Sequence, residues 1–415
     1  MPQCKEEVAA PAPDRAAWPR PMMLHLSMAI ASSGADAGTR WQNAFTTALN
    51  SARSGDAAAG GCAAADLASL GLGLTTDGLG RLRDLIEAIG KYQRHPFRRA
   101  AVEAVPIWSE GTTRLLDYGP PGGAPVLFVP SLVNRYWILD LMPGHSLMHH
   151  LRGPLRPILV DWGDPGPRER GFDVGHYVRR IARAIAAIAA LAGRPVPVAG
   201  YCMGGTLAVA ATTLARRDVA ALALLAAPWD FRAGGGMLAQ TFGGDGGAAQ
   251  RSAWAGHIAG WGELPVDVLQ GFFALIDPNL AERKFRRFAG LDPAGEEAAL
   301  FVALEDWLND GVPLVAGVAR AALFDWYGAG LPAAGEWRVG RRRILPERLG
   351  LPTFAAVPRR DRLVPPASAE GLIERLGPVE AVRPDTGHIG LMIGSAAIDV
   401  VWDPLARWLA RHAAV

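Results

Sequence analysis

Apolar runs alternate with amphipathic segments through the middle of the chain. Short, nearly continuous apolar runs are typical of strands buried on both faces, and apolar residues three and four positions apart are typical of helices. The runs predict strands at 113–118, 126–129, 157–161, 196–199 and 219–227, and the spacing predicts helices at 176–192 and 206–217. Strands alternating with helices indicate an α/β fold with a mostly parallel central sheet.

The alternation stops at Trp229 and resumes at Pro352. The intervening residues are first glycine-rich and then mostly helical in spacing, with many aromatic side chains. After them the pattern predicts a strand at 352–358, a helix at 367–376, a strand near 379–383 and a last helix ending at His412. A helical segment inserted between two strands of one sheet predicts a cap over the functional site.

The predicted domain organisation therefore has four segments. Residues 1–80 are rich in Ala, Gly, Ser and Pro and are expected to be poorly structured or partly helical; a helix is predicted from Gly78 to Pro96. The core is predicted in two parts, 81–228 and 347–415, separated by a cap at 229–346.

Composition narrows the class of protein. Half of the residues are apolar, which excludes a mainly disordered chain, and 42 basic against 40 acidic residues argue against a nucleic-acid partner. Three scattered cysteines predict neither a disulfide scaffold nor a zinc site. No apolar run approaches the roughly 20 residues of a transmembrane helix, and the N-terminus lacks a basic signal-peptide region. We expect a cytoplasmic protein without a transmembrane segment.

The sharpest motif is Gly200-Tyr-Cys202-Met-Gly204, between a predicted strand and a predicted helix. This is the nucleophile-elbow pattern, with Cys in the place of Ser. The small glycines let the central residue adopt a strained turn, so that its side chain projects at the carboxyl end of the strand. The helix that follows favours a thiolate there through its dipole. The alternative interpretation is a buried structural cysteine.

A nucleophile at such an elbow needs an acid and then a histidine further along the chain. Asp361 follows the strand at 352–358, and His388 follows the next strand. Loops at the same edge of a parallel sheet converge, so Cys202, Asp361 and His388 are the predicted catalytic residues. His388 would take the thiol proton, and Asp361 would orient the imidazole. Asp385 is a competing acid.

Acyl transfer also needs donors for an oxyanion. We expect these to be the backbone N–H of Met203 and one N–H from 131–133, assigned to Val133. No metal site and no cofactor are predicted; His145, His149 and His150 are interpreted as structural.

With these residues the chain resembles the polyhydroxyalkanoate synthases, a family of cysteine-dependent enzymes with the α/β-hydrolase fold. The resemblance runs from about Val102 to Val415. It is carried by segments around the oxyanion loop, the elbow, the acid, the histidine and the cap: 129–141, 200–206, 361–366, 387–390, 305–310 and 335–340.

The resemblance implies an acyltransferase that polymerises 3-hydroxyacyl-CoA and releases CoA. Cys202 would carry the acyl group as a thioester, His388 would be the base, and Asp361 would support it. The expected partners are the CoA thioester, the growing polyester and its granule surface, a second copy of the chain, and a small accessory synthase subunit.

Two rival functions stay open. A thioesterase or a hydroxyalkanoate ester hydrolase could use the same three residues, although ester hydrolases of this fold mostly use Ser. A non-catalytic granule-associated binding protein would tolerate the loss of Cys202, Asp361 and His388, and the chain retains all three.

Overall fold

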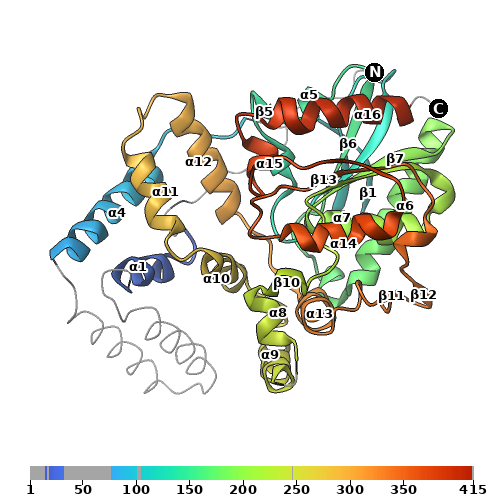
Figure 1. The fold of residues 1–415 in the computed structure, drawn as a ribbon. Helices are drawn as coiled ribbons and strands as arrows, with labels where there is room; N and C mark the ends of the chain where they lie inside the picture. Colours follow the sequence, from blue (N-terminus) through green and yellow to red (C-terminus); the bar gives the residue numbers. More distant parts are fainter. Residues whose placement is uncertain (1–14, 16–17, 32–75, 101–103, 245, 414–415) are drawn as a thin grey trace. The chain divides into compact units, whose positions relative to one another are not determined.

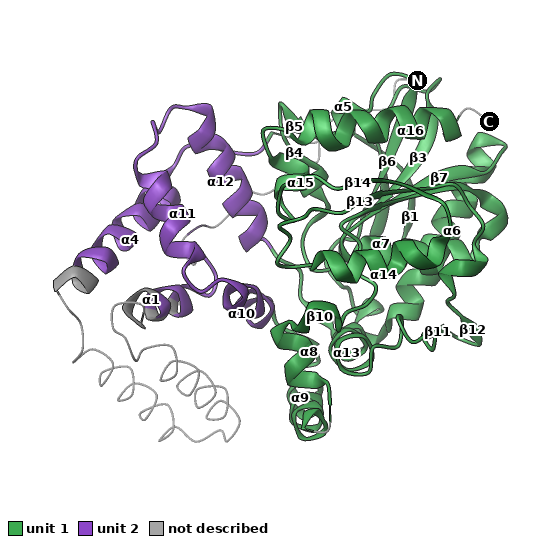
Figure 2. Cartoon of the chain, in the orientation of Figure 1, with its two compact units in different colours: residues 1–10, 100–265, 311–415 green, residues 11–99, 266–310 purple. Residues whose placement is uncertain are grey.

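The computed structural model describes residues 15, 18–31, 76–100, 104–244 and 246–413. The chain divides into two compact units (Figure 2). The sheet unit comprises 1–10, 100–265 and 311–415, and the helical unit comprises 11–99 and 266–310.

The sheet unit is built on an eight-stranded sheet in the order β1-β2-β6-β3-β7-β8-β13-β14. The six strands from β6 to β14 are parallel, and β1 and β2 pair antiparallel at one end. Their bounds are β1 (Val105–Glu110), β2 (Thr113–Asp117), β3 (Ala124–Val129), β6 (Leu155–Asp161), β7 (Val196–Tyr201), β8 (Val219–Leu225), β13 (Thr353–Ala356) and β14 (Val379–Val382). The predicted fold class is confirmed: this is a mostly parallel sheet of the α/β-hydrolase type.

Helices cover both faces of this sheet. On one face lie α6 (Val174–Ala192), α7 (Met203–Leu214) and α14 (Pro366–Leu376), and on the other lies α16 (Asp403–Ala413) (Figure 1). Every residue of β7 is buried, as the continuous apolar runs predict for strands covered on both sides. Shorter elements at the strand ends are η2 (Tyr136–Leu139), β4 (Asp140–Met142), β5 (His145–Ser146), α5 (Leu147–His150), η3 (Glu169–Gly171), η4 (Arg216–Asp218), η7 (Pro346–Arg348), α15 (Gly390–Ile393) and η8 (Ile398–Trp402).

Both predicted boundaries of one helix are wrong: the helix expected at 206–217 begins three residues earlier, at Met203, and ends three residues earlier, at Leu214. Gly204 and Gly205 stand immediately before the predicted start. They lie instead in the first helical turn, because a Cβ atom on Gly204 would stand 2.1 Å from the carbonyl oxygen of Val129. Close approach of the helix to β3, rather than turn formation, requires this glycine.

The segment between β8 and β13 is largely helical, as predicted. Its described elements are η5 (Ala233–Gly235), α8 (Met237–Phe242), α9 (Gly247–Trp261), β9 (Glu263–Leu264), α10 (Val266–Ile276), α11 (Leu280–Ala289), α12 (Glu296–Asn309), β10 (Leu314–Val315), α13 (Ala316–Arg320), the π-helix η6 (Ala321–Gly328), β11 (Arg338–Val339) and β12 (Arg342–Arg343). The middle of this segment, 266–310, groups with 11–99. The four predicted segments and the boundaries between them stay predictions.

The helical unit contains α1 (Met22–Ala31), α4 (Thr76–Arg94) and α10 to α12. Its apolar core includes Leu85, Tyr92, Phe285 and Val302, all fully or almost fully buried. The helix predicted from Gly78 is therefore present, whereas most of the N-terminal extension lies outside the described residues. Across the described part of the chain, no helix combines the length and apolarity needed to span a bilayer.

Buried charges connect distant parts of the helical unit. The Arg15 guanidinium binds the Asp306 carboxylate at 2.6 Å, and the Tyr92 hydroxyl donates to the same carboxylate at 3.0 Å. Next to it, Lys284 binds the buried Glu305 at 2.8 Å. Each buried charge thus has an opposite charge within contact, which offsets its desolvation.

Candidate active site

Cys202 lies between the end of β7 and the start of α7, in a backbone conformation that residues other than glycine rarely adopt. Its φ is 55° and its ψ is −132°. Backbone hydrogen bonds hold this turn: the Cys202 N–H donates to Leu225 O at 2.9 Å, and the Gly205 N–H donates to Cys202 O at 2.8 Å. A Cβ on Gly200 would stand 2.4 Å from the Gly205 Cα, so glycine is required there. This is the geometry of a nucleophile elbow.

Asp361 and His388 lie in the loops that follow β13 and β14, and the structure brings them together. The Asp361 Oδ2 and the His388 Nδ1 are 2.6 Å apart, and both side chains are buried. The other oxygen, Oδ1, accepts the N–H groups of Leu363 at 2.9 Å and Val364 at 2.8 Å. The carboxylate is thereby fixed with one oxygen facing the imidazole.

His388 also hydrogen-bonds to Cys202, so it joins the acid to the thiol. Burial alone would lower the pKa of His388. The negative charges of the Cys202 thiolate and then of Asp361 outweigh burial and raise the pKa to about 10. This raised pKa favours the imidazolium form of His388 at neutral pH.

The competing acid, Asp385, does not contact His388 through a described hydrogen bond. It is exposed and pairs with Arg360 at 3.0 Å. Of the two candidate acids, Asp361 is the one that reaches the imidazole.

Two tyrosines near Cys202 were not identified from the sequence. The Tyr201 hydroxyl donates to His388 O at 3.3 Å, and its ring lies 5.2 Å from the imidazole. Burial raises the pKa of Tyr201, and the charges of Cys202 and Asp361 raise it further. For Tyr327, on η6, burial and then the charge of Cys202 raise the pKa well above its ordinary value. Position next to Cys202 could have indicated Tyr201, but no sequence pattern indicates Tyr327.

The predicted oxyanion donors differ in their surroundings. Met203 is the first residue of α7, where backbone N–H groups have no acceptor within the helix. The Val133 N–H donates to the Ser131 Oγ at 3.2 Å, and the Val133 carbonyl accepts the Val312 N–H at 2.9 Å. Val133 would have to exchange the Ser131 hydroxyl for an oxyanion, so both assignments stay predictions.

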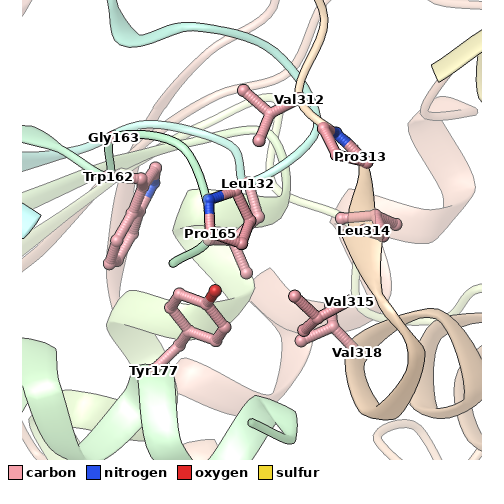
Figure 3. Close-up of a pocket in the computed structure, with 10 residues that line it drawn as sticks. All are labelled: Leu132, Trp162, Gly163, Pro165, Tyr177, Val312, Pro313, Leu314, Val315 and Val318. Atoms are coloured by element: carbon pink, nitrogen blue, oxygen red, sulfur yellow. The ribbon is translucent and has the colours of Figure 1, made fainter. Parts of the chain in front are cut away.

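A small apolar pocket lies beside the loop that contains Val133 (Figure 3). Its free volume is about 10 Å³, room for roughly one water molecule and too little for an acyl group. The phenol of Tyr177 points toward this pocket (Figure 3). The lining residues are Leu132, Trp162, Gly163, Pro165, Tyr177, Val312, Pro313, Leu314, Val315 and Val318.

Two of the three histidines near residue 150, His149 and His150, make contacts typical of structural residues. The backbone N–H of His149 donates to the Ser146 Oγ at 3.1 Å. The His150 Nε2 lies 2.9 Å from the Asp403 Oδ1. Within the residues that the structure describes, no group of three or more His, Cys, Asp or Glu side chains could hold a metal ion. The prediction that no cofactor is needed stays a prediction.

Comparison with known proteins finds sequence relatives of one kind. The chain is 28% identical over 319 residues to a poly(3-hydroxyalkanoate) polymerase subunit of Haloferax mediterranei, covering 74% of this chain and 63% of that protein. The corresponding subunit of Haloarcula marismortui is 26% identical, with coverage of 69% and 61%. That of Synechocystis is 28% identical, with coverage of 74% and 84%. The resemblance stated from the motifs is confirmed, and the chain spans just under two thirds of the first two relatives.

No protein-family model matches the chain. Among solved structures, the thioesterase domain from the curacin biosynthetic pathway is 15% identical, with a TM-score of 0.46, covering 75% of this chain and 99% of that one. An alpha/beta hydrolase fold protein from Nakamurella multipartita is 18% identical, with a TM-score of 0.44 and coverage of 73% and 96%.

Proposed function

We propose that this chain, a sequence relative of the poly(3-hydroxyalkanoate) polymerases, is an acyltransferase that joins 3-hydroxyacyl groups from coenzyme A thioesters into a polyester. The observation that carries the proposal is the buried 2.6 Å contact between Asp361 and His388, with His388 hydrogen-bonded to a cysteine on a strained elbow. The substrate class comes from the relatives, which are poly(3-hydroxyalkanoate) polymerase subunits.

The first half-reaction transfers the acyl group to the enzyme. The Cys202 thiolate attacks the thioester carbonyl, and N–H donors at the start of α7 stabilise the oxyanion that forms. The bond between the carbonyl carbon and the CoA sulfur then breaks. The leaving CoA thiolate takes the proton from His388, so CoA departs as a free thiol and Cys202 holds a thioester.

The second half-reaction forms the ester. Neutral His388 takes the proton from the 3-hydroxyl of another acyl unit, and its oxygen attacks the Cys202 thioester. The ester bond forms, and the sulfur leaves as a thiolate paired again with imidazolium. A cysteine suits this exchange because its thioester is close in energy to the CoA thioester, so the intermediate is not a deep energy minimum.

The same proposal covers partners and place of action. Acyl transfer between thiols and hydroxyls is redox-neutral and has its nucleophile and base within the chain, so no resident metal or cofactor is proposed. A growing polyester would keep the protein at a granule surface within the cytoplasm. A homodimer and a small accessory synthase subunit are part of the proposal.

The experiment measures CoA release from 3-hydroxybutyryl-CoA by the purified full chain and analyses the product for polymer and free acid. Wild type is expected to release CoA and form polymer. Cys202→Ala should abolish release, and Cys202→Ser should strongly reduce it. The matched control Cys62→Ala, which removes a cysteine that is not one of the three proposed catalytic residues, should retain activity.

Two results would contradict the proposal. Free 3-hydroxybutyrate without polymer would make the chain a thioesterase on the same residues. Unchanged CoA release by Cys202→Ala would remove the cysteine from the reaction altogether.

A further inference from the structure

We propose that an open pocket beside the proposed active site binds the phosphorylated ribose of coenzyme A. Arg232 binds the phosphate, and Asp230 accepts a hydrogen bond from the neighbouring ribose hydroxyl. The identity of the ligand rests on the proposed function, which makes coenzyme A part of the substrate. The pocket is separate from the catalytic residues, because none of the three lines it.

Two segments of the sheet unit form this pocket. Asp230, Arg232 and Ala233 come from the chain that follows β8, and alanines and Gly330 from 329–334 form the rest of the wall. The pocket has a volume of about 350 Å³ and opens to solvent. Ligand pockets commonly measure about 300–1,000 Å³, so this one has room for a sugar phosphate.

Contacts of the chain after β8 place the pocket beside the loop that contains Asp361. The Asp230 N–H donates to Ser368 O, in the first turn of α14, at 3.2 Å. A Cβ on Gly234 would stand 2.9 Å from the Pro365 Cβ, at the end of the loop between β13 and α14. Asp361 lies in the same loop. The pocket therefore borders the loop that carries the acid of the proposed active site.

Arg232 gives this pocket a positive charge without a protein partner. Its side chain is exposed, and its guanidinium makes no hydrogen bond or ion pair with the residues that the structure describes. The stem of the side chain packs on the backbone of Gly330, where φ is 69° and a Cβ would stand 2.8 Å from the Arg232 Cδ. This contact holds the arginine at the pocket. A planar guanidinium can bind two phosphate oxygens at once.

Asp230 supplies an acceptor beside that charge. Its Oδ1 accepts the N–H groups of Arg232 at 3.0 Å and Ala233 at 3.2 Å. Its Oδ2 has no hydrogen-bond partner in the described part of the chain, and Asp230 forms no ion pair with Arg232 there. Oδ2 is therefore available to a hydroxyl donor.

These two side chains select a particular kind of ligand. A carboxylate repels a free phosphate ion, so the pocket suits an anion that carries a hydroxyl donor next to its charge. The ribose of coenzyme A has this arrangement, with a 2′-hydroxyl beside the 3′-phosphate. Dinucleotide-binding proteins likewise use an acidic side chain for a ribose hydroxyl and an arginine for a ribose phosphate.

The test is isothermal titration calorimetry of the purified full chain with coenzyme A and with 3′-dephospho-CoA, which lacks only the ribose phosphate. Wild type should bind coenzyme A about tenfold more tightly than 3′-dephospho-CoA, because a charge-assisted hydrogen bond is lost in the second ligand. Arg232→Gln should weaken coenzyme A binding about tenfold and leave 3′-dephospho-CoA unchanged, so that the two ligands bind equally.

The matched control is Arg217→Gln. Arg217 is also exposed and has no partner among the described residues, but it lies on η4, before β8, at the opposite end of that strand from the pocket. This variant should bind both ligands as wild type does. Asp230→Asn keeps an oxygen for the two N–H groups and replaces Oδ2 by an NH₂ donor. It should weaken both ligands about fivefold.

Three results would overturn the inference. The first is equal affinity of wild type for coenzyme A and 3′-dephospho-CoA. The second is unchanged coenzyme A affinity in Arg232→Gln. The third is displacement of coenzyme A by inorganic phosphate as readily as by adenosine 3′,5′-bisphosphate, because the pocket would then recognise an anion without its ribose.

The titration involves no acyl group and no turnover, so it separates this inference from the proposed function. A preference for coenzyme A that is lost in Arg232→Gln, in a chain that forms no polymer, would support the pocket and contradict polymerisation. Polymer formation by a chain whose coenzyme A affinity does not depend on Arg232 would do the reverse.

Discussion

Asp361 uses its two carboxylate oxygens differently. Oδ1 accepts two backbone N–H groups, from Leu363 and Val364, whereas Oδ2 faces His388. An Asn at this position must turn its oxygen toward the two N–H groups and present its NH₂ to Nδ1. The imidazole would then carry its proton on Nε2 and could not accept one from the thiol or from a substrate hydroxyl.

We therefore expect Asp361→Asn to lower kcat for CoA release by about three to four orders of magnitude without unfolding the chain. Steady-state kinetics with 3-hydroxybutyryl-CoA measure the effect. Asp385→Asn is the matched control, because Asp385 is exposed and pairs with Arg360 rather than with His388. Equal losses in the two variants would show that Asp361 has no special part.

At this scale the sequence predicts the residues whose chemistry is tied to a motif. Cys202 lies between glycines, and Asp361 and His388 each follow a strand, so topology places them together. Tyr327 has no such marker. Its ring lies 5.2 Å from that of Phe231, a contact that depends on how the inserted segment packs.

The tight approach between β3 and the start of α7 depends on one glycine. A Cβ on Gly204 would stand 2.1 Å from Val129 O and 2.6 Å from Pro130 O, both backbone atoms that cannot move without shifting the end of β3 and the loop that follows it. We expect Gly204→Ala to lower the free energy of unfolding by at least about 3 kcal/mol. Urea unfolding measures it.

The matched control is Gly256→Ala, in the middle of α9. A Cβ there meets no atom within 4 Å, and an alanine in a helix interior stabilises by about 0.5–1 kcal/mol relative to glycine. A Gly204→Ala variant as stable as wild type would mean that the elbow is packed less tightly than the structure shows.

Elements were predictable where burial is uniform. Strands such as β7 and β8 read as continuous apolar runs because helices cover both of their faces. The start of α7 was not predictable, because the helical propensity of Gly204 and Gly205 is low. Only the proximity of β3 explains why glycine is found there in a helix. Tertiary packing decides this boundary, and local sequence does not report it.

At the scale of the whole molecule, the grouping of 266–310 with the N-terminal residues was not predictable. The contacts that define the helical unit join positions nearly 300 residues apart, as in the Arg15–Asp306 pair. Periodicity reports which face of a helix is apolar but not which distant helix covers it. The core formed by Tyr92 and Phe285 is therefore visible only in the structure.

The helical unit also contains a histidine that should make folding sensitive to acid. His25 lies on α1; its Nε2 is 3.1 Å from Arg20 O, and its Nδ1 is buried without a partner among the described residues. Burial, and then the positive charge of Lys284, lower the pKa of His25 to about 4. In the unfolded chain this pKa is about 6.5.

Between pH 6.5 and pH 4 the unfolded chain therefore binds more protons at this position than the folded chain does. Stability conferred by neutral His25 is complete above pH 6.5 and is lost as the pH falls toward 4, by up to about 3 kcal/mol. Burial raises the pKa of the neighbouring Glu305, which contributes in the opposite sense.

Replacing His25 with Gln isolates its part, because Glu305 and every other group titrate in both proteins. Urea unfolding of wild type and His25→Gln at pH 7, 5.5 and 4 should show wild type losing more stability than the variant as the pH falls. Any constant penalty of the substitution cancels in this comparison. Curves that stay parallel from pH 7 to pH 4 would mean that His25 is as accessible to protons in the folded chain as in the unfolded one, and that α1 does not bury it in solution.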